Sequence, residues 1–251
     1  MRRTFIRLSS LVFLVGCVGA AGLPPQNKAA VADVVITRAK VGDTKSDADR
    51  VPDASNVAVW LAPLDRNNAT GTVLLPLVAK PPELVQRHKT FEPHVLVVQV
   101  GTLVAFPNKD PFFHNIFSLY DGKRFDLGLY EAGTTRSVLF DRPGVSFLFC
   151  NIHAEMSAVI VAVDTPYFGL SDRSGHVIIP NLPEGRYQLN VWYERSLPEI
   201  LRGLTRVVTI SDATRNVGVI RIPEDSNFTP THKNKYGLDY VPAPHPDYDY
   251  P

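Results

Sequence analysis

The sequence predicts an all-β protein that folds into two sandwiches. Short runs of β-branched and aromatic residues recur along the chain, and turn-forming residues separate them. No segment keeps the apolar period of about 3.6 residues over the three turns that a clear amphipathic helix would show. The 251 residues include 21 prolines and 16 glycines and are 45% hydrophobic. This composition supplies many turns and enough apolar side chains for one or two cores.

The composition also excludes several classes of protein. With 26 Lys+Arg and 25 Asp+Glu the formal net charge is +1, whereas a nucleic-acid-binding protein would carry a basic stripe. Two cysteines are too few for a disulfide scaffold or a multi-cysteine zinc site. No apolar run reaches the roughly 18 residues of a membrane-spanning helix. We therefore expect no nucleic acid among the partners and no membrane contact beyond a lipid anchor.

Residues 1–20 have the pattern of an export signal, in which basic Arg2, Arg3 and Arg7 precede a short apolar run and then small residues. Two processing sites stay open. Residues 14–17 (LVGC) fit a bacterial lipobox, which would make Cys17 the lipidated N-terminus, whereas residues 18–20 (VGA) fit ordinary cleavage. Either site predicts a protein of the periplasm or cell envelope, present in soluble form or as a lipoprotein anchored to the outer membrane.

The first part of the chain alternates between linkers and strands. Residues 22–30 are predicted as a linker, and residues 34–41 and 56–64 as strands with a polar loop between them. An apolar stretch over residues 71–80 ends at two prolines. Strand patterns then follow closely, at residues 95–100, 103–106, 136–140, 145–149 and 158–163.

The second part of the chain continues this pattern and then changes. Further short strands are predicted at residues 177–179, 187–193, 206–210 and 217–222, with turns before the first two. Residues 225–251 are polar and rich in proline and tyrosine, and we expect an extended or disordered tail there.

One cluster of residues carries recognisable metal chemistry. Cys150, His153 and Met156 follow the pattern C-x2-H-x2-M, and His114 lies upstream in a separate segment. Two imidazoles, one thiolate and one thioether are the ligand set of a mononuclear electron-transfer copper site. Cys150 is also the only thiol outside the leader, and an unpaired cysteine in an oxidising compartment must be buried, paired between chains or bound to a metal.

Other interpretations of these residues stay open. A lone cysteine or methionine is often a buried apolar side chain, and His114 could be a hydrogen-bonded core histidine. Zinc fits poorly because methionine is not a usual zinc ligand. Storage or delivery of copper(I) remains an alternative, since sulfur ligands also hold that ion.

The segment from Gln99 to Asp164 resembles the cupredoxins, the small blue-copper electron carriers with a Greek-key β-sandwich. The resemblance rests on residues 91–93 (FEP), 100–108 (VGTLVAFPN) and the C-x2-H-x2-M motif, whose spacing is similar to the short loop of amicyanins. It implies one type 1 copper held by His114, Cys150, His153 and Met156, with Asn115 bracing the ligand loop. The whole chain resembles bacterial methylamine utilisation proteins and other plastocyanin-like periplasmic proteins.

The flanking segments resemble another family. Residues 171–177 (SDRSGHV) and 181–187 (NLPEGRY) look like the later half of a carboxypeptidase regulatory-like, or transthyretin-like, sandwich. Residues 56–64 would supply its missing early strand, which implies that the cupredoxin is inserted into it; two sandwiches in series are the alternative. The expected organisation is an export signal (1–20), a split Ig/transthyretin-like sandwich (31–66 and 165–224), a cupredoxin (67–164) and a tail (225–251).

These patterns predict an exported electron carrier and not an enzyme. The resemblance implies that His153 lies nearest the surface, with an apolar rim for brief docking of a c-type cytochrome or an oxidoreductase; the candidates for this rim are Phe112, Phe113, Ile152 and Ala154. A copper-delivery module and a non-redox structural binding protein with a vestigial site are the alternatives. The remaining histidines and acids are expected to be solvated or structural: His88, His94, His176, His232, His245, Asp172, Glu184 and Glu194. The two tail histidines among them are also candidates for loose copper binding.

Overall fold

The computed structural model describes residues 28–37, 53–65, 80–119, 121–229 and 232–240. The predicted export signal with Cys17, most of the apolar stretch over residues 71–80, and His245 lie outside the described residues. Sixteen strands and one short helix make up the regular structure of the described residues, so the predicted all-β class is confirmed. No described helix has the length and apolarity needed to cross a membrane.

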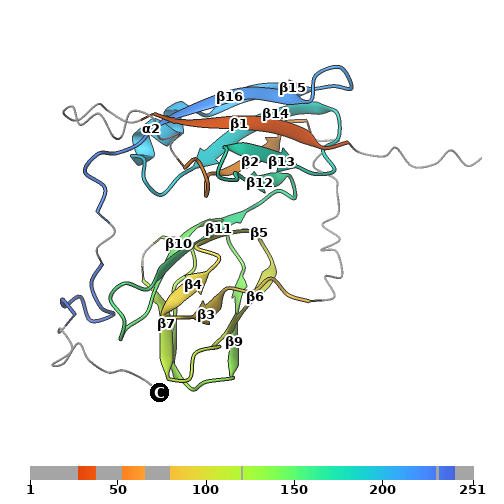
Figure 1. The fold of residues 1–251 in the computed structure, drawn as a ribbon. Coiled ribbons are helices and arrows are strands. Elements are labelled where there is room, and N and C mark those ends of the chain that lie inside the picture. The colour runs from red at the N-terminus through yellow and green to blue at the C-terminus, as the bar shows by residue number, and fades with distance from the viewer. Residues whose placement is uncertain (1–27, 38–52, 66–79, 120, 230–231, 241–251) are drawn as a thin grey trace, which may run out of the picture.

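The first sandwich consists of two sheets, with strand orders β13-β1-β16 and β12-β2-β14-β15 (Figure 1). Their apolar faces enclose one core, which includes Leu61, Tyr187 and Ile220. The elements are β1 (Ala30–Thr37), β2 (Ala58–Pro63), β12 (Phe168–Leu170), β13 (His176–Ile179), β14 (Gly185–Trp192), α2 (Pro198–Gly203), β15 (Arg206–Ile210) and β16 (Asn216–Pro223).

In the described part of the chain, β1 and β2 take all their strand partners from the segment after residue 167. β1 runs antiparallel to β13 and parallel to β16, and β2 lies between β12 and β14. Trp60 pairs with Asn190 in this register. Buried hydrogen bonds add to this pairing. Thr165 Oγ1, just before β12, donates to Leu61 O of β2 at 2.9 Å, and Ser171 Oγ donates to Ala54 O, just before β2, at 2.6 Å. The chain thus leaves this sandwich after β2 and returns to it at β12.

We expect a fragment of residues 164–224 to be poorly folded. It lacks β1, the central strand of one sheet, and β2, an inner strand of the other, so both sheets would expose unpaired edges. Circular dichroism should show no cooperative thermal transition in the fragment, whereas the full chain should show one. A cooperative transition in the fragment would mean that its strands form a sandwich without β1 and β2.

The second sandwich is formed by residues between β2 and β12. A five-stranded sheet of order β5-β11-β10-β7-β8 faces the pair β6-β9, and a pair of short strands, β3-β4, adjoins β6 through isolated bridges. Phe106, Phe140, Leu148 and Ile160 are fully buried in its core. The strands are β3 (Val85–Arg87), β4 (Thr90–Glu92), β5 (Val95–Gln99), β6 (Thr102–Pro107), β7 (His114–Ser118), β8 (Phe125–Tyr130), β9 (Thr135–Phe140), β10 (Gly144–Phe149) and β11 (Ser157–Val163).

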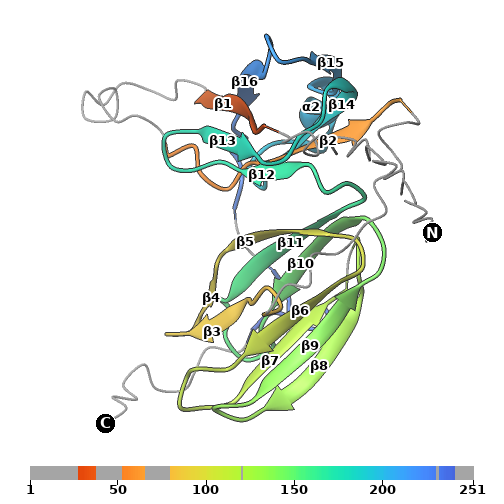
Figure 2. The ribbon, with the colours of Figure 1, turned by 90° about the vertical axis from the view of Figure 1, so that its right-hand side faces the viewer.

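An apolar layer joins the two sandwiches, which lie one above the other in Figures 1 and 2. Valines of β5 and β11, among them Val95 and Val161, pack with Ala58 of β2 in one cluster. The rings of Phe147 and Trp192 meet there with centroids 6.3 Å apart. Burial of this apolar surface favours a fixed relation between the sandwiches.

Some elements differ from those expected. β1 begins at Ala30, which shortens the predicted linker. The expected strands do not include β3, β4, β7, β8 or β12, and α2 was not expected either. α2 has only six residues, too few for an apolar periodicity, although Pro198, Glu199 and Arg202 are typical helix-end residues.

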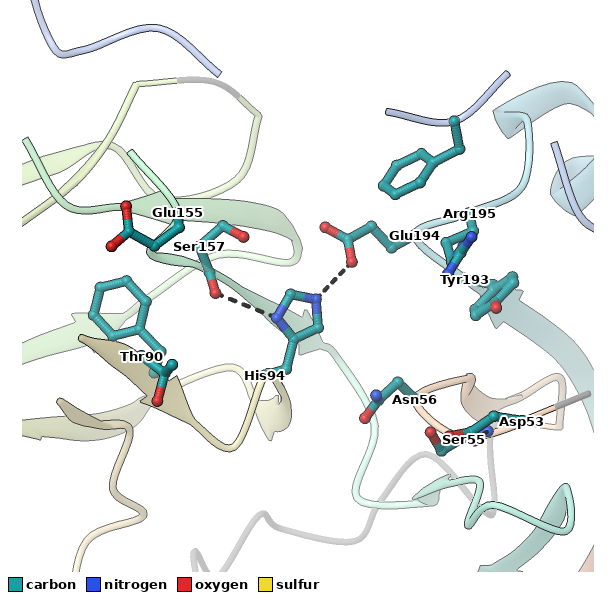
Figure 3. Close-up of a pocket in the computed structure, with 12 residues that line it drawn as sticks. Asp53, Ser55, Asn56, Thr90, His94, Glu155, Ser157, Tyr193, Glu194 and Arg195 are labelled. Atoms are coloured by element: carbon teal, nitrogen blue, oxygen red, sulfur yellow. Dashed lines mark hydrogen bonds and ion pairs between the residues drawn. The ribbon is translucent and has the colours of Figure 1, made fainter. Parts of the chain in front are cut away.

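A polar contact accompanies the apolar layer, in a cavity of about 640 Å³ lined by residues of both sandwiches (Figure 3). His94 Nε2 lies 2.6 Å from Glu194 Oε2, and His94 Nδ1 lies 3.2 Å from Ser157 O. Glu194 was expected to be a surface residue, but its side chain is only 16% exposed and is the partner of His94.

The proton on His94 should stabilise the folded protein. The hydrogen bond to Glu194 raises the pKa of His94, although burial opposes this. Because the pKa is higher in the folded than in the unfolded state, protonation of His94 favours folding. The stabilisation should be complete below the ordinary histidine value of 6.5 and should be lost as the pH rises through the raised value.

Denaturant titration of the metal-free protein at several pH values would measure this effect. The difference in unfolding free energy between the wild type and His94→Gln should shrink as the pH rises from 6.5 through the raised pKa of His94. Glu194→Gln should remove most of the pH dependence that His94 contributes. A difference that stays constant from pH 5 to 9 would contradict the prediction.

Candidate metal centre

The candidate ligands lie at one end of the second sandwich, where three strands end or begin. His114 is the first residue of β7, and Cys150 directly follows β10. β10 and β11 pair as far as Phe149 and Ser157, so residues 150–156 form a short loop, here called the ligand loop. Two backbone hydrogen bonds close it: Cys150 N donates to Met156 O at 3.2 Å and Met156 N donates to His153 O at 3.1 Å.

The fold brings three metal-binding side chains together. Ligand atoms of His114, Cys150 and His153 all lie within 4.8 Å of one another. Cys150 Sγ is 3.8 Å from His114 Nδ1 and 3.6 Å from His153 Nδ1. Met156 is fully buried in the same core cluster as Cys150. His114 and Cys150 are also fully buried, whereas His153 is half-buried, so the cluster is open to the surface on the His153 side.

The surroundings favour neutral ligands in the absence of a cation. Burial raises the pKa of the Cys150 thiol, although the backbone N–H groups of Asn115, Ile152 and His153 oppose this shift. Burial also lowers the pKa of both His114 and His153. Neutral imidazoles are ready to bind a metal, and the thiol must release its proton when it does so.

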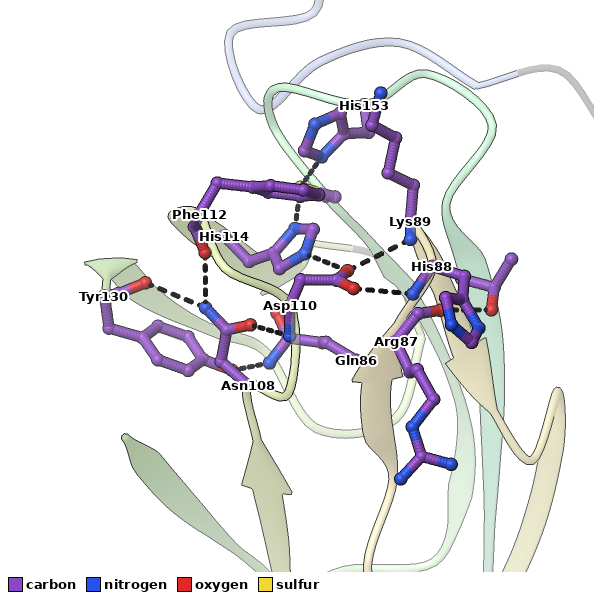
Figure 4. Close-up of polar contacts among 12 residues, drawn as sticks. Gln86, Arg87, His88, Lys89, Asn108, Asp110, Phe112, His114, Tyr130 and His153 are labelled. Atoms are coloured by element: carbon purple, nitrogen blue, oxygen red, sulfur yellow. Dashed lines mark hydrogen bonds and ion pairs between the residues drawn. The ribbon is translucent and has the colours of Figure 1, made fainter. Parts of the chain in front are cut away.

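A buried carboxylate that sequence reasoning missed fixes the orientation of His114 (Figure 4). His114 Nε2 lies 2.8 Å from Asp110 Oδ2, and Asp110 accepts further hydrogen bonds from His88 N at 2.6 Å and Lys89 N at 3.0 Å. Burial alone would raise the pKa of Asp110, but these hydrogen bonds hold it below its usual value. The ionised carboxylate accepts a hydrogen bond from the Nε2–H group of His114. The proton therefore stays on Nε2, and the lone pair of Nδ1 is directed to Cys150.

Asn108 shapes the loop that carries Asp110. Its side chain accepts a hydrogen bond from Asp110 N at 3.0 Å and donates one to Phe112 O at 2.8 Å. The Phe112 ring in turn contacts both imidazoles, with centroids 5.1 Å from His114 and 5.6 Å from His153. The sequence places Asp110 four residues before His114, but this spacing by itself does not show that the two side chains are in contact.

The other predicted site residues have varied surroundings. The Asn115 side chain donates to Asp126 Oδ1 at 2.7 Å, on β8, while its backbone N–H faces the Cys150 sulfur. In the expected rim, Phe113 is 55% exposed and Ile152 is 46% exposed. Ala154 is exposed as well, and Phe112 is half-buried.

In the described part of the chain, the side chains of the remaining histidines lie outside the cluster of ligand atoms, and that of His232 packs beside the ligand loop. His88 is exposed, and His176 pairs with Asp33 at 3.1 Å in the first sandwich. His232 of the tail is half-buried and stacks on Phe149, with ring centroids 4.0 Å apart. Residues 232–240 of the expected extended or disordered tail pack beside the ligand loop and form neither a helix nor a strand.

No model of a known protein family matches the sequence, and no curated protein sequence matches it either. Solved structures do match part of the fold. A copper-containing nitrite reductase from Thermus scotoductus SA-01 is 25% identical with a TM-score of 0.33; the match covers 34% of this chain and 23% of that one, less than a quarter of its length.

Two smaller proteins are matched over most of their length. A purple cupredoxin from Nitrosopumilus maritimus is 22% identical with a TM-score of 0.30, and the match covers 33% of this chain and 99% of that one. A mutant of amicyanin in its Cu(I) form is 17% identical with a TM-score of 0.32, and the match covers 33% of this chain and 82% of that one. About two thirds of the present chain lies outside each match.

The chemistry of the donor set itself fits copper. A thiol, two imidazole nitrogens and a nearby buried thioether combine soft and borderline donors, which type 1 copper sites use. Hard ions such as Mg²⁺ and Ca²⁺ prefer oxygen ligands, and no carboxylate belongs to the cluster in the described part of the chain.

Proposed function

We propose that this protein binds one copper ion through His114, Cys150, His153 and Met156 and carries single electrons between redox partners. One observation carries the proposal: a thiol and two imidazoles converge within 4.8 Å at one buried end of a β-sandwich. The fully buried Met156 completes the donor set of a blue-copper site.

Copper supplies a one-electron couple when bound, and the chain supplies a stiff, largely dry ligand frame. β7, β10 and β11 belong to one sheet, so the backbone on either side of the ligands is fixed by strand pairing. Asp110 fixes the His114 ring, and the backbone N–H groups near Cys150 favour the thiolate form. A frame that moves little between two charge states keeps the reorganisation energy small, which favours fast electron exchange.

The surface beside His153 is the proposed point of electron entry and exit. His153 is the half-buried ligand, and exposed Phe113 and Ile152 lie in neighbouring segments. An apolar rim of this kind suits a small, short-lived interface with a redox protein, such as a c-type cytochrome or an oxidoreductase. Four protein donors leave no open position for a substrate, so we propose a carrier and not an enzyme.

The leader composition supports action outside the cytoplasm, in the periplasm or cell envelope. Residues 1–20 have the pattern of an export signal, and lipidation of Cys17 would add an anchor to the outer membrane. A buried metal-binding role also accounts for Cys150 as a single thiol in an oxidising compartment.

Copper delivery is the second candidate function, because two of the four donors are sulfur atoms, which hold copper(I) well. Protein-film voltammetry together with a copper(I) chelator would separate the two functions. A carrier should give a reversible one-electron wave and retain copper in the presence of a competing chelator. Fast transfer of copper to the chelator, without a reversible wave, would favour delivery.

We expect Met156 to be a weak ligand that adjusts the reduction potential and contributes little to copper affinity. Met156→Leu should still bind copper and should have a higher potential, because loss of a weak thioether donor leaves the oxidised state less stabilised. Voltammetry of the copper-loaded variant would measure the change. Loss of copper binding would show instead that Met156 is a primary ligand, and a lowered potential would show that its thioether does not donate to the metal.

A further inference from the structure

The chain after β16 connects the first sandwich to the metal-binding end of the second. Figure 1 shows it in blue, running from the upper sandwich to the side of the lower one. Near its start, Asp225 N donates to Arg195 O at 2.7 Å, and the Arg195 guanidinium lies 5.6 Å from the Phe228 ring. Residues 232–240, here called the strap, lie against the ligand loop.

The strap contacts three consecutive residues centred on the thiol. Tyr240 Oη donates to Cys150 O at 2.5 Å. His232 stacks on Phe149 at an interplanar angle of 24°, and Lys235 N donates to the Asn151 side-chain oxygen at 3.0 Å. Cys150 is fully buried and Phe149 is 9% exposed, so the strap covers a face of the chain directly beside a proposed ligand.

A second set of contacts ties the strap to the segment that carries His114. Lys235 Nζ lies 2.8 Å from Asp126 Oδ2, and the other oxygen of that carboxylate accepts the Asn115 amide at 2.7 Å. The strap also holds its own shape through a turn, in which Asn234 N donates to Leu238 O at 2.9 Å. It is therefore an ordered element with contacts on both sides of the cluster.

We propose that the strap is part of the metal centre, in which Tyr240 is a positioning residue that fixes the Cys150 backbone and, together with His232, shields the thiol. The ligand loop is short and has few backbone hydrogen bonds of its own, so an added donor restricts its opening. The Tyr240 hydroxyl group directs its partly positive hydrogen at Cys150 O. This positive charge favours the reduced state of the site, because that state is the more negative one. The redox part of this inference rests on the proposed function, whereas the shielding of Cys150 needs no metal.

The reactivity of Cys150 in the metal-free protein tests the shielding. A thiol-specific disulfide reagent should modify Tyr240→Phe about two- to tenfold faster than the wild type, the factor expected for the loss of one hydrogen bond. A chain that ends at Thr229 should react faster still. Tyr236→Phe is the matched control, because Tyr236 is a tyrosine of the same strap with 71% of its surface exposed, and it should react at the wild-type rate.

The reduction potential of the copper-loaded variants tests the positioning role. Tyr240→Phe should have a lower potential than the wild type, and Tyr236→Phe should be unchanged. A general loss of stability would not shift the potential of the folded protein in this selective way. Equal thiol reactivity and equal potentials in Tyr240→Phe and Tyr236→Phe would overturn the proposal. Failure of every variant to bind copper would count against the proposed function, while the metal-free rates would still decide the shielding.

Discussion

Replacing Cys150 with serine should abolish the intense visible absorption that we expect from the copper(II)-loaded protein. The band arises from charge transfer between a thiolate and copper, and Cys150 supplies the only thiol in the described part of the chain. Absorption spectra of wild type and variant after addition of one equivalent of copper(II) would show the change. A serine hydroxyl is of similar size, so thermal unfolding of the metal-free variant should stay cooperative.

Histidine variants provide a matched pair for the same measurement. His114→Gln should weaken the band strongly, because it removes a buried donor 3.8 Å from Cys150 Sγ. His176→Gln changes a histidine that pairs with Asp33 in the first sandwich and should leave the spectrum unchanged. A colourless wild-type complex, or a band that survives in Cys150→Ser, would refute a blue-copper site at this position.

Replacing Asp110 with asparagine should weaken copper binding by about 10- to 100-fold, the usual cost of losing a hydrogen-bond partner of a ligand histidine. It should also raise the reduction potential, because the variant removes a buried negative charge 2.8 Å from His114 Nε2 that stabilises the oxidised site. Competition with a chelator of known affinity and voltammetry would measure the two effects. In the metal-free protein, nitrogen NMR should report a change in the His114 tautomer population.

Asp33→Asn is the matched control for Asp110→Asn. Asp33 also pairs with a histidine, at 3.1 Å, but this pair is about half-exposed and lies in the other sandwich. It should change neither copper affinity nor potential. If Asp110→Asn behaved like this control, the carboxylate would have no part in the metal centre.

The sequence by itself predicted the all-β class and the residues of the proposed donor set. Short apolar runs separated by turns predict strands, because the side-chain period of a strand is visible within a few residues. Cys150, His153 and Met156 are equally local, since they share one loop between two paired strands. Their residue types alone indicate soft-metal chemistry, so both conclusions follow from near neighbours in the chain.

Only the tertiary structure decided what surrounds those donors. Asp110 belongs to the site because His88 and Lys89 fix its carboxylate, and Tyr240 reaches Cys150 although 90 residues separate them in the sequence. The contact of His94 with Glu194 likewise joins residues 100 positions apart. Such contacts have no periodicity and no fixed spacing. They exist because the packing of two sandwiches and a strap brings distant backbone segments together, which residue types and local patterns do not encode.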